Sequence, residues 1–181
     1  MTKKIIAFAA SNSERSINKQ FAEYTAGQLT AVETTILDLN NFELPVYSVD
    51  LEKESGVPVN AIRFAQFIQE ADGIIISLAE YNGLYTSAFK NLWDWMSRIG
   101  TPKVWQDKPM FLMGTSPSKR PGSYVMKVSQ SLFPLFGANI IASFHLPSFN
   151  YFFRDGQIVE PTQKEIHTTE LEKFQTYLLN N

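Results

Sequence analysis

The sequence of 181 residues contains no cysteine. This absence excludes a disulfide framework, catalysis by a thiol, and a zinc or cluster site held by thiolates. A chain without cysteine is compatible with a reducing compartment, and we expect the protein to be cytoplasmic.

Long hydrophobic runs are also lacking. The apolar residues 5–10 follow two lysines, as in a secretory signal, but these six residues are too few for the core of such a signal. We therefore expect them to form the first strand. No later segment approaches the length of a membrane span, which needs about 20 apolar residues, so we expect no membrane partner.

A large excess of charge of one sign is absent, because the net charge is −2. This balance gives no electrostatic reason to expect a nucleic acid or an anionic membrane surface as a partner. With 44% hydrophobic and 19% charged residues, the composition is that of a soluble globular protein. The length is most simply that of one domain over residues 1–181.

Several catalytic and metal-binding motifs are missing. The sequence has no G-x-S-x-G segment of a serine hydrolase, and neither His145 nor His167 has a second ligand at metal spacing. We therefore predict no metal site and assign both histidines to structure or solvent contact. A G-x-G-x-x-G fingerprint is absent after the first apolar run, which argues against a resident dinucleotide.

Five apolar runs alternate with helical patterns, which predicts an α/β fold with a parallel sheet. The strand count and right-handed crossovers favour a flavodoxin-like three-layer sandwich with the strand order 2-1-3-4-5. The strands are expected at residues 5–9, 33–39, 74–78, 109–113 and 138–144. The helices are expected from residue 18, from a cap at Asn60, over residues 86–98, along Val125, Val128, Leu132 and Leu135, and along Leu171, Phe174 and Leu178. Residues 40–58 predict a long polar loop, and Asp155-Gly156 predicts a hairpin-like turn.

The loop after the first expected strand, residues 10–18, is crowded with hydrogen-bond donors. Because a helix begins here, its unpaired amides and the positive end of its dipole converge on the same place. The loop therefore predicts a site for a phosphate monoester. The alternative is an ordinary helix N-cap, for which one such residue suffices. The donors are the hydroxyls of Ser11, Ser13 and Ser16, the amide of Asn18 and the positive charge of Arg15.

A second unusual loop, residues 79–83, follows the third expected strand. It offers an aromatic plane, amide groups and a glycine that lets a flat ligand approach the backbone closely. In the order 2-1-3-4-5, the sheet reverses direction between its first and third strands, so the loops at 10–18 and 79–83 should meet. FMN, a phosphate on a spacer that carries a planar ring, fits both loops. The alternative is that Tyr81 and Asn82 only make a turn.

Both loops resemble motifs of one family. Residues 10–18, A-S-N-S-E-R-S-I-N, resemble the phosphate loop G-S-x-R-x-x-S-x-N of the NAD(P)H-dependent FMN reductases, a group with chromate, quinone and azo-dye reductases. Residues 79–83 and 89–95 resemble that family's P-E-Y-N-x-S-x-P-x-x-L-K-N-x-I-D-W. The similarity extends from the first strand to about the fifth. The departures are Ala10 for a glycine, Ser13 for an arginine, and Ala79 and Thr86 for prolines.

The resemblance implies that Ser11, Ser16 and Asn18 hold the FMN phosphate, with Arg15 compensating for the arginine that is missing at Ser13. The loop at 79–83 would border the isoalloxazine, largely through main-chain groups. Ser116 lies in a third loop, residues 114–122, which would reach toward the ring unless it is an ordinary connection. No catalytic side chain is predicted. The predicted cofactor-binding residues are Ser11, Ser13, Arg15, Ser16, Ile17, Asn18, Ala79, Glu80, Tyr81, Asn82, Gly83 and Ser116.

The resemblance also implies an activity, in which hydride passes from NADPH or NADH through the flavin to a small acceptor. The acceptor could be a quinone, an azo compound, a metal ion or free flavin. Arg15, Lys119 and Arg120 are candidates to meet the donor's phosphates. Two alternatives stay open: an FMN-binding electron carrier without NAD(P)H activity, and a flavin-free domain for another phosphorylated ligand. A net charge of −2 does not favour the carrier, which would use strong acidity to dock on basic partners.

The expected helix over residues 86–98 is apolar on two sides. One side can pack on the sheet, and a homodimer would bury the other. The resemblance implies the same assembly, with a tetramer also possible, whereas the alternative is a deeply buried helix in a monomer. One side consists of Ala88, Leu92, Trp95 and Ile99. The other side consists of Phe89, Trp93 and Met96.

Overall fold

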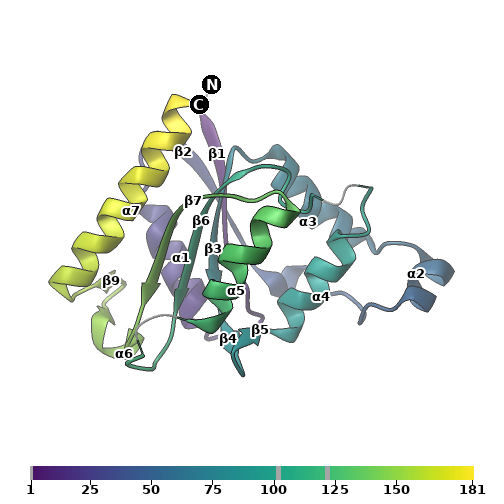
Figure 1. The fold of residues 1–181 in the computed structure, drawn as a ribbon, viewed down its shortest axis with the longest axis horizontal. Helices are drawn as coiled ribbons and strands as arrows, with labels where there is room; N and C mark the ends of the chain where they lie inside the picture. Colours follow the sequence, from purple (N-terminus) through teal and green to yellow (C-terminus); the bar gives the residue numbers. More distant parts are fainter. Residues whose placement is uncertain (1, 101–102, 121–122) are drawn as a thin grey trace.

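The core of the fold is a five-stranded parallel sheet, which the computed structural model describes within residues 2–100, 103–120 and 123–181. The spatial order is β2-β1-β3-β6-β7, and every neighbouring pair is parallel (Figure 1). Counted along the chain without the small hairpins, this is the predicted order 2-1-3-4-5, so the predicted fold class is confirmed. The strands are β1 (Lys3–Ala9), β2 (Val32–Leu37), β3 (Gly73–Leu78), β6 (Pro109–Thr115) and β7 (Asn139–Leu146).

Helices cover both faces of the sheet and make three layers (Figure 1). On one face, α1 (Ile17–Gly27) and α7 (Pro161–Asn180) bury Phe21 and Phe174. The other face carries α3 (Val59–Glu70), α4 (Ser87–Met96) and α5 (Tyr124–Leu132). The predicted apolar side of the C-terminal helix, Leu171, Phe174 and Leu178, is buried.

The burial of the strands follows their sequence patterns. Every residue of β3 is buried, Ser77 included, as expected for a largely apolar run in the middle of a parallel sheet. The edge strand β2 has alternating polar residues, and most of its residues are partly or fully exposed. The strands leave the sheet at the same edge, so their connecting loops are brought together there.

Two short hairpins lie outside the main sheet. β4 (Glu80–Tyr81) and β5 (Leu84–Tyr85) are joined by Asn82 and Gly83, whose φ values are 53° and 85°. β8 (Phe153–Arg154) and β9 (Gln157–Ile158) follow the short α6 (Phe149–Phe152). Their turn is Asp155-Gly156, with φ values of 49° and 73°. Positive φ at both central residues is typical of tight hairpins, and the predicted turn at 155–156 is confirmed.

The long polar loop predicted at residues 40–58 is wrong in part, because it contains regular structure. It begins within the short helix η1 (Leu39–Asn41) and includes α2 (Val49–Ser55). Residues 44–55, here called the covering segment, lie on α4. The indole Nε1 of Trp95 donates to the Pro45 carbonyl at 2.8 Å, and the Tyr47 amide donates to Asn91 Oδ1 at 2.8 Å. The contacts come from residues about fifty positions away, which a local pattern cannot reveal.

Two further predictions of helix ends are corrected. Asn60 does not cap α3, since Pro58 holds the cap position and Asn60 Nδ2 donates to the Glu43 carbonyl at 3.0 Å. The helix expected to reach Leu135 ends at Leu132 and continues as the 3₁₀ turn η2 (Phe133–Phe136). Pro134 lacks the amide that an α-helix needs, and the left-handed Gly137 ends the turn. Leu135 is consequently 77% exposed.

Both apolar sides of α4 are buried within the same chain. Leu92 and Trp95 lie among the buried residues of this helix, and the covering segment packs on Trp95 through Tyr47. On the other side, Trp93 contacts the rings of Trp105 and Phe133. The burial of these rings therefore gives no evidence for a partner subunit, although Ala88 and Ile99 on the first side are only partly buried. The homodimer therefore does not follow from this helix and stays a prediction.

Replacing Trp95 with phenylalanine should loosen the covering segment. The variant loses the hydrogen bond to the Pro45 carbonyl and part of a buried ring, so we expect the free energy of unfolding to fall by about 2 kcal/mol. Amide hydrogen exchange in residues 44–55 should become faster. Trp105→Phe is the control, because Trp105 is equally buried and its Nε1 has no hydrogen-bond partner among the described residues. Equal exchange in the two variants would show that the indole hydrogen bond does not hold this segment.

Candidate functional site

A cleft opens at the switch point of the sheet, where strands are added on opposite sides of β1. It lies at the carboxyl ends of β1, β3 and β6. Its volume is about 230 Å³. The two loops predicted to meet both contribute to its walls, so the predicted juxtaposition is present. All predicted cofactor-binding residues line the cleft except Asn82 and Gly83, while Thr115 and Pro117 were not predicted. The lining residues are Ser11, Ser13, Arg15, Ser16, Ile17, Asn18, Ala79, Glu80, Tyr81, Thr115, Ser116 and Pro117.

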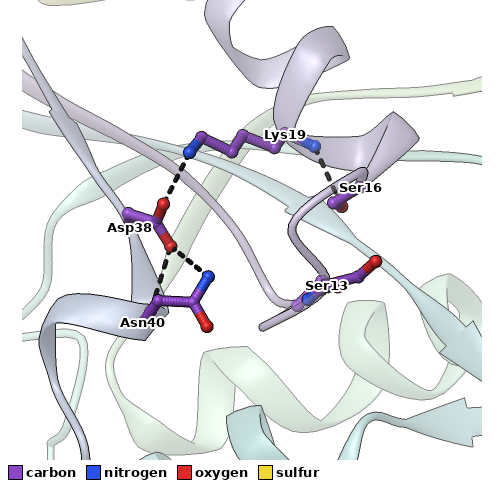
Figure 2. Close-up of polar contacts among 6 residues, drawn as sticks. Ser13, Ser16, Lys19, Asp38 and Asn40 are labelled. Atoms are coloured by element: carbon purple, nitrogen blue, oxygen red, sulfur yellow. Dashed lines mark hydrogen bonds and ion pairs between the residues drawn. The ribbon is translucent and has the colours of Figure 1, made fainter.

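The loop after β1 is shaped by its own hydroxyls. Ser16 caps α1, with its Oγ accepting from the Lys19 amide at 3.2 Å (Figure 2). Ser11 Oγ accepts from the Ser13 amide at 3.2 Å, and the Ser16 amide donates to the Ser13 carbonyl at 3.2 Å. The amides of the first two helical residues, Ile17 and Asn18, have no acceptor within a helix, so they can donate to a bound anion.

Asn18 has a second role that the sequence did not reveal. Its side chain is only 3% exposed and joins α1 to the ends of two strands. Asn18 Oδ1 accepts from Ser77 Oγ at 2.8 Å and from the Thr115 amide at 3.0 Å, and Nδ2 donates to the Thr115 carbonyl at 3.3 Å. Asn18 therefore holds the loop after β1 in a fixed position relative to the ends of β3 and β6. Direct binding of phosphate by its amide stays a prediction.

Replacing Asn18 with alanine should destabilise the whole cleft. Ser77 Oγ and the buried Thr115 amide lose their acceptor, so we expect the free energy of unfolding to fall by about 2 kcal/mol in chemical denaturation. Asn12→Ala is the control, because Asn12 is an exposed asparagine of the same loop, and it should change stability by less than about 0.5 kcal/mol. A stable Asn18→Ala protein would mean that water replaces the lost contacts.

Glu80 anchors the second wall of the cleft to α5. Its carboxylate accepts from Ser123 Oγ at 2.5 Å and from the Val125 amide at 3.1 Å. Burial alone would raise the pKa of Glu80, but these hydrogen bonds, the Tyr124 amide and the nearby Arg120 together lower it below its ordinary value. The negative charge also meets the positive end of the α5 dipole. The neighbouring residue Tyr81 is 54% exposed at the rim of the cleft.

The third loop is tied to the strand and turn that follow it. The Ser116 amide donates to the Leu146 carbonyl at 3.3 Å, and the Ser148 amide donates to the Ser118 carbonyl at 2.8 Å. A second pocket of about 250 Å³ adjoins the cleft and shares Glu80, Thr115, Ser116 and Pro117 with it. Its other lining residues are Ser118, Arg120, Ser123 and His145. Residues 121 and 122 of the predicted loop 114–122 lie outside the described residues.

The two histidines occupy different surroundings. His167 is buried in the core, where its Nε2 is 2.9 Å from Thr25 Oγ1, and burial lowers its pKa to about 4. His145 lies at the end of β7 beside the second pocket. Burial lowers the pKa of His145, although the charge of Glu80 acts in the opposite direction. Among the described residues, no group of histidine and acidic side chains is arranged to hold a metal ion.

The family model described as NADPH-dependent FMN reductase matches residues 3–150. The chain belongs to this family. The matched range contains both loops of the cleft, and the resemblance drawn from their motifs is confirmed.

Curated relatives in this family share parts of the chain. A 2-hydroxy-1,4-benzoquinone reductase of Burkholderia is 36% identical over 117 residues, which are 64% of this chain and 62% of that protein. A quinone reductase of Escherichia coli K12 is 33% identical over 78 residues, 40% of this chain and 42% of the relative. The chain thus matches less than two thirds of the length of either.

A solved structure shares the fold over nearly the whole chain. The flavoenzyme NAD(P)H:(acceptor) oxidoreductase FerB of Paracoccus denitrificans superposes with a TM-score of 0.80. The sequences are 19% identical, and 98% of each chain is covered. At this identity the likeness concerns the fold alone.

Two departures from the pattern of the FMN reductase family have local explanations. Thr86, which replaces a proline, caps α4 through the Phe89 amide and donates from Oγ1 to the Ala10 carbonyl at 2.9 Å. A proline has no hydroxyl for either bond. Ala10, which replaces a glycine, is fully buried, and its amide donates to the Ser77 carbonyl at 2.9 Å. Since Ala10 has no positive φ, its backbone does not require glycine.

The donor set of the cleft fits the phosphate of FMN. Ser11, Ser13, Ser16 and Arg15 line the cleft together with the first two residues of α1, so three hydroxyls, a guanidinium and two helix-start amides are available there. A phosphate monoester has several acceptor oxygens and close to two negative charges, which this set can satisfy. Ala79, Glu80 and the exposed Tyr81 line the cleft as well.

Within residues 2–100, 103–120 and 123–181, no helix combines the length and the apolar character that crossing a membrane requires.

Proposed function

We propose that this protein is an NAD(P)H-dependent oxidoreductase that binds FMN in the cleft and reduces a small acceptor with electrons from NADPH or NADH. The observation that carries the proposal is the cleft itself. Its phosphate donors lie at the switch point of the sheet, in a chain that belongs to the NADPH-dependent FMN reductase family.

In this proposal, Ser11, Ser13, Arg15 and Ser16 hold the phosphate together with the amides of residues 17 and 18. The backbone of residues 79–83, the ring of Tyr81 and Ser116 border the isoalloxazine. The flavin supplies the hydride-accepting and hydride-donating chemistry when it is bound. The side chains of the cleft bind and orient, and none is assigned as an acid, a base or a nucleophile.

A quinone is the acceptor class that we propose. Several similar proteins bear the name quinone reductase or quinone oxidoreductase, from Escherichia coli and from Arabidopsis thaliana. The second pocket, of about 250 Å³, gives room beside the cleft for a small ring with polar edges. His145, Ser118 and Arg120 can donate hydrogen bonds to the oxygens of such a ring.

We also propose a homodimer in which the partner covers the rim of the cleft. Three large side chains at this rim, Tyr81, Leu84 and Tyr124, are 54%, 52% and 54% exposed. Exposed apolar groups gathered beside a site favour an interface. Sedimentation velocity measures the assembly, and a monomer at micromolar concentration contradicts it. A cytoplasmic location stays a prediction.

One set of titrations tests the proposed function. FMN should quench the intrinsic fluorescence of the apoprotein and raise its melting temperature, and NADPH or NADH should then bleach the flavin absorbance. A quinone should restore that absorbance. Bleaching that fails in FMN-loaded protein would favour an electron carrier, and protein that binds no FMN would favour a flavin-free domain for another phosphorylated ligand.

A further inference from the structure

An ion pair lies beside the start of α1, outside the lining of the cleft. Lys19 Nζ is 2.5 Å from Asp38 Oδ2, and the two side chains are 33% and 23% exposed. Figure 2 shows the lysine side chain extending from α1 toward the end of β2, while the side chain of Ser13 points away from Asp38. Lys19 is the third helical residue of α1, and its own amide donates to Ser16 at the edge of the cleft.

Asp38 is held in place independently of Lys19. It follows β2 and caps η1, with Oδ1 accepting from the amide of Asn40 at 3.0 Å and from Asn40 Nδ2 at 2.9 Å (Figure 2). One carboxylate oxygen therefore organises the turn, and the other is left for the lysine. The carboxylate would keep its place, and its charge, if the lysine were removed.

The two charges cancel each other next to the predicted phosphate site. The hydrogen bond with Asp38 raises the pKa of Lys19, and Glu23 acts in the same direction. Burial would raise the pKa of Asp38, but the hydrogen bonds from Lys19 and Asn40 lower it overall. Both groups are therefore charged at neutral pH. Lys19 is one turn from Ser16, so removal of either partner leaves one unbalanced charge close to the helix start.

We propose that Asp38 is a specificity-determining residue, which sets how strongly the cleft prefers a phosphorylated flavin over an unphosphorylated one by neutralising Lys19. This role rests on the proposed function, because it requires the phosphate to bind at residues 11–18. Arg15 then supplies the positive charge that lines the cleft, and Lys19 contributes only when Asp38 is changed.

The two single variants should act in opposite directions. Asp38→Asn keeps an oxygen that can cap η1 but releases the charge of Lys19, so the affinity for FMN should rise about fivefold. Lys19→Met keeps the aliphatic stem but uncovers the charge of Asp38, so the affinity for FMN should fall about fivefold. The affinity for riboflavin, which has no phosphate, should stay within about twofold in both variants.

Fluorescence quenching titrations with FMN and with riboflavin measure the ratio of the two affinities. The double variant Asp38→Asn, Lys19→Met should return to within about twofold of the wild-type ratio, and about 1 M salt should shrink both single shifts. Lys173→Met is the charge-matched control, since it removes one exposed lysine from α7 and should leave the ratio unchanged.

The outcomes separate this role from the proposed function. A purely structural ion pair predicts that both single variants lose affinity for both flavins, and that result would overturn the role of Asp38. Shifts of equal sign in the FMN to riboflavin ratio would overturn it as well. If the wild-type protein binds FMN and riboflavin equally well, the phosphate site of the proposed function fails.

Discussion

Replacing Ser16 with aspartate is expected to weaken FMN binding about a hundredfold while leaving the fold as stable as before. Ser16 lines the cleft, is only 7% exposed, and caps α1 by accepting from the Lys19 amide. Aspartate caps helices as well as serine does, so the variant should keep its melting temperature. Its carboxylate, however, lies where the phosphate is proposed to bind. Repulsion in a partly buried place accounts for a loss of about 2.7 kcal/mol, which is a hundredfold in affinity.

Ser16→Asn is the matched control. Asparagine is an equally good cap and carries no charge, so the affinity for FMN should fall by less than about tenfold. Riboflavin separates repulsion of the phosphate from a general disturbance of the loop. It has no phosphate, so the carboxylate introduced by Ser16→Asp should not repel it, and it should bind both variants alike. Tight binding of FMN by Ser16→Asp would place the phosphate away from this loop and would remove the basis of the proposed function.

The sheet could be predicted because its signals are local. Residues 5–9 form an uninterrupted apolar run and residues 74–78 form one interrupted only by Ser77, and such runs are typically buried on both faces of a parallel sheet. The order of the strands then follows from general rules on crossovers. The covering segment could not be predicted, because α2 has no buried residue and the segment is held to α4 through Pro45 and Tyr47, which bond to Trp95 and Asn91.

The candidate site also has one part that could be predicted from the sequence and one part that could not. The meeting of residues 10–18 and 79–83 follows from the strand order, since both loops leave the carboxyl ends of neighbouring parallel strands. The partners of individual side chains do not follow. Glu80 finds Ser123, which is 43 positions away, and Asn18 finds Thr115, which is 97 positions away. No spacing in the sequence relates these residues, because their contacts depend on how the finished loops pack.

The buried His167 should make stability depend steeply on pH between about 4 and 6.5. It is 1% exposed, its Nε2 contacts Thr25 Oγ1, and the rings of Phe21, Tyr24 and Phe144 surround it. Burial lowers its pKa from 6.5 to about 4, since the core cannot hydrate an imidazolium. The folded protein therefore binds the proton less readily than the unfolded chain does. Its contribution to stability is complete above pH 6.5 and is lost as the pH falls toward 4.

At about 1.36 kcal/mol for each pKa unit, this linkage amounts to roughly 3 kcal/mol of unfolding free energy between pH 7 and pH 4. His167→Gln separates it from the carboxylates that titrate in the same range, because glutamine can keep a hydrogen bond with Thr25 and carries no titrating proton. Denaturant titrations of both proteins across pH 4 to 7 should show the wild-type curve falling more steeply by about this amount. Parallel curves would mean that the imidazolium is accommodated in the core, for example by a local opening of α7 that admits water, and His167 would then have no part in acid sensitivity.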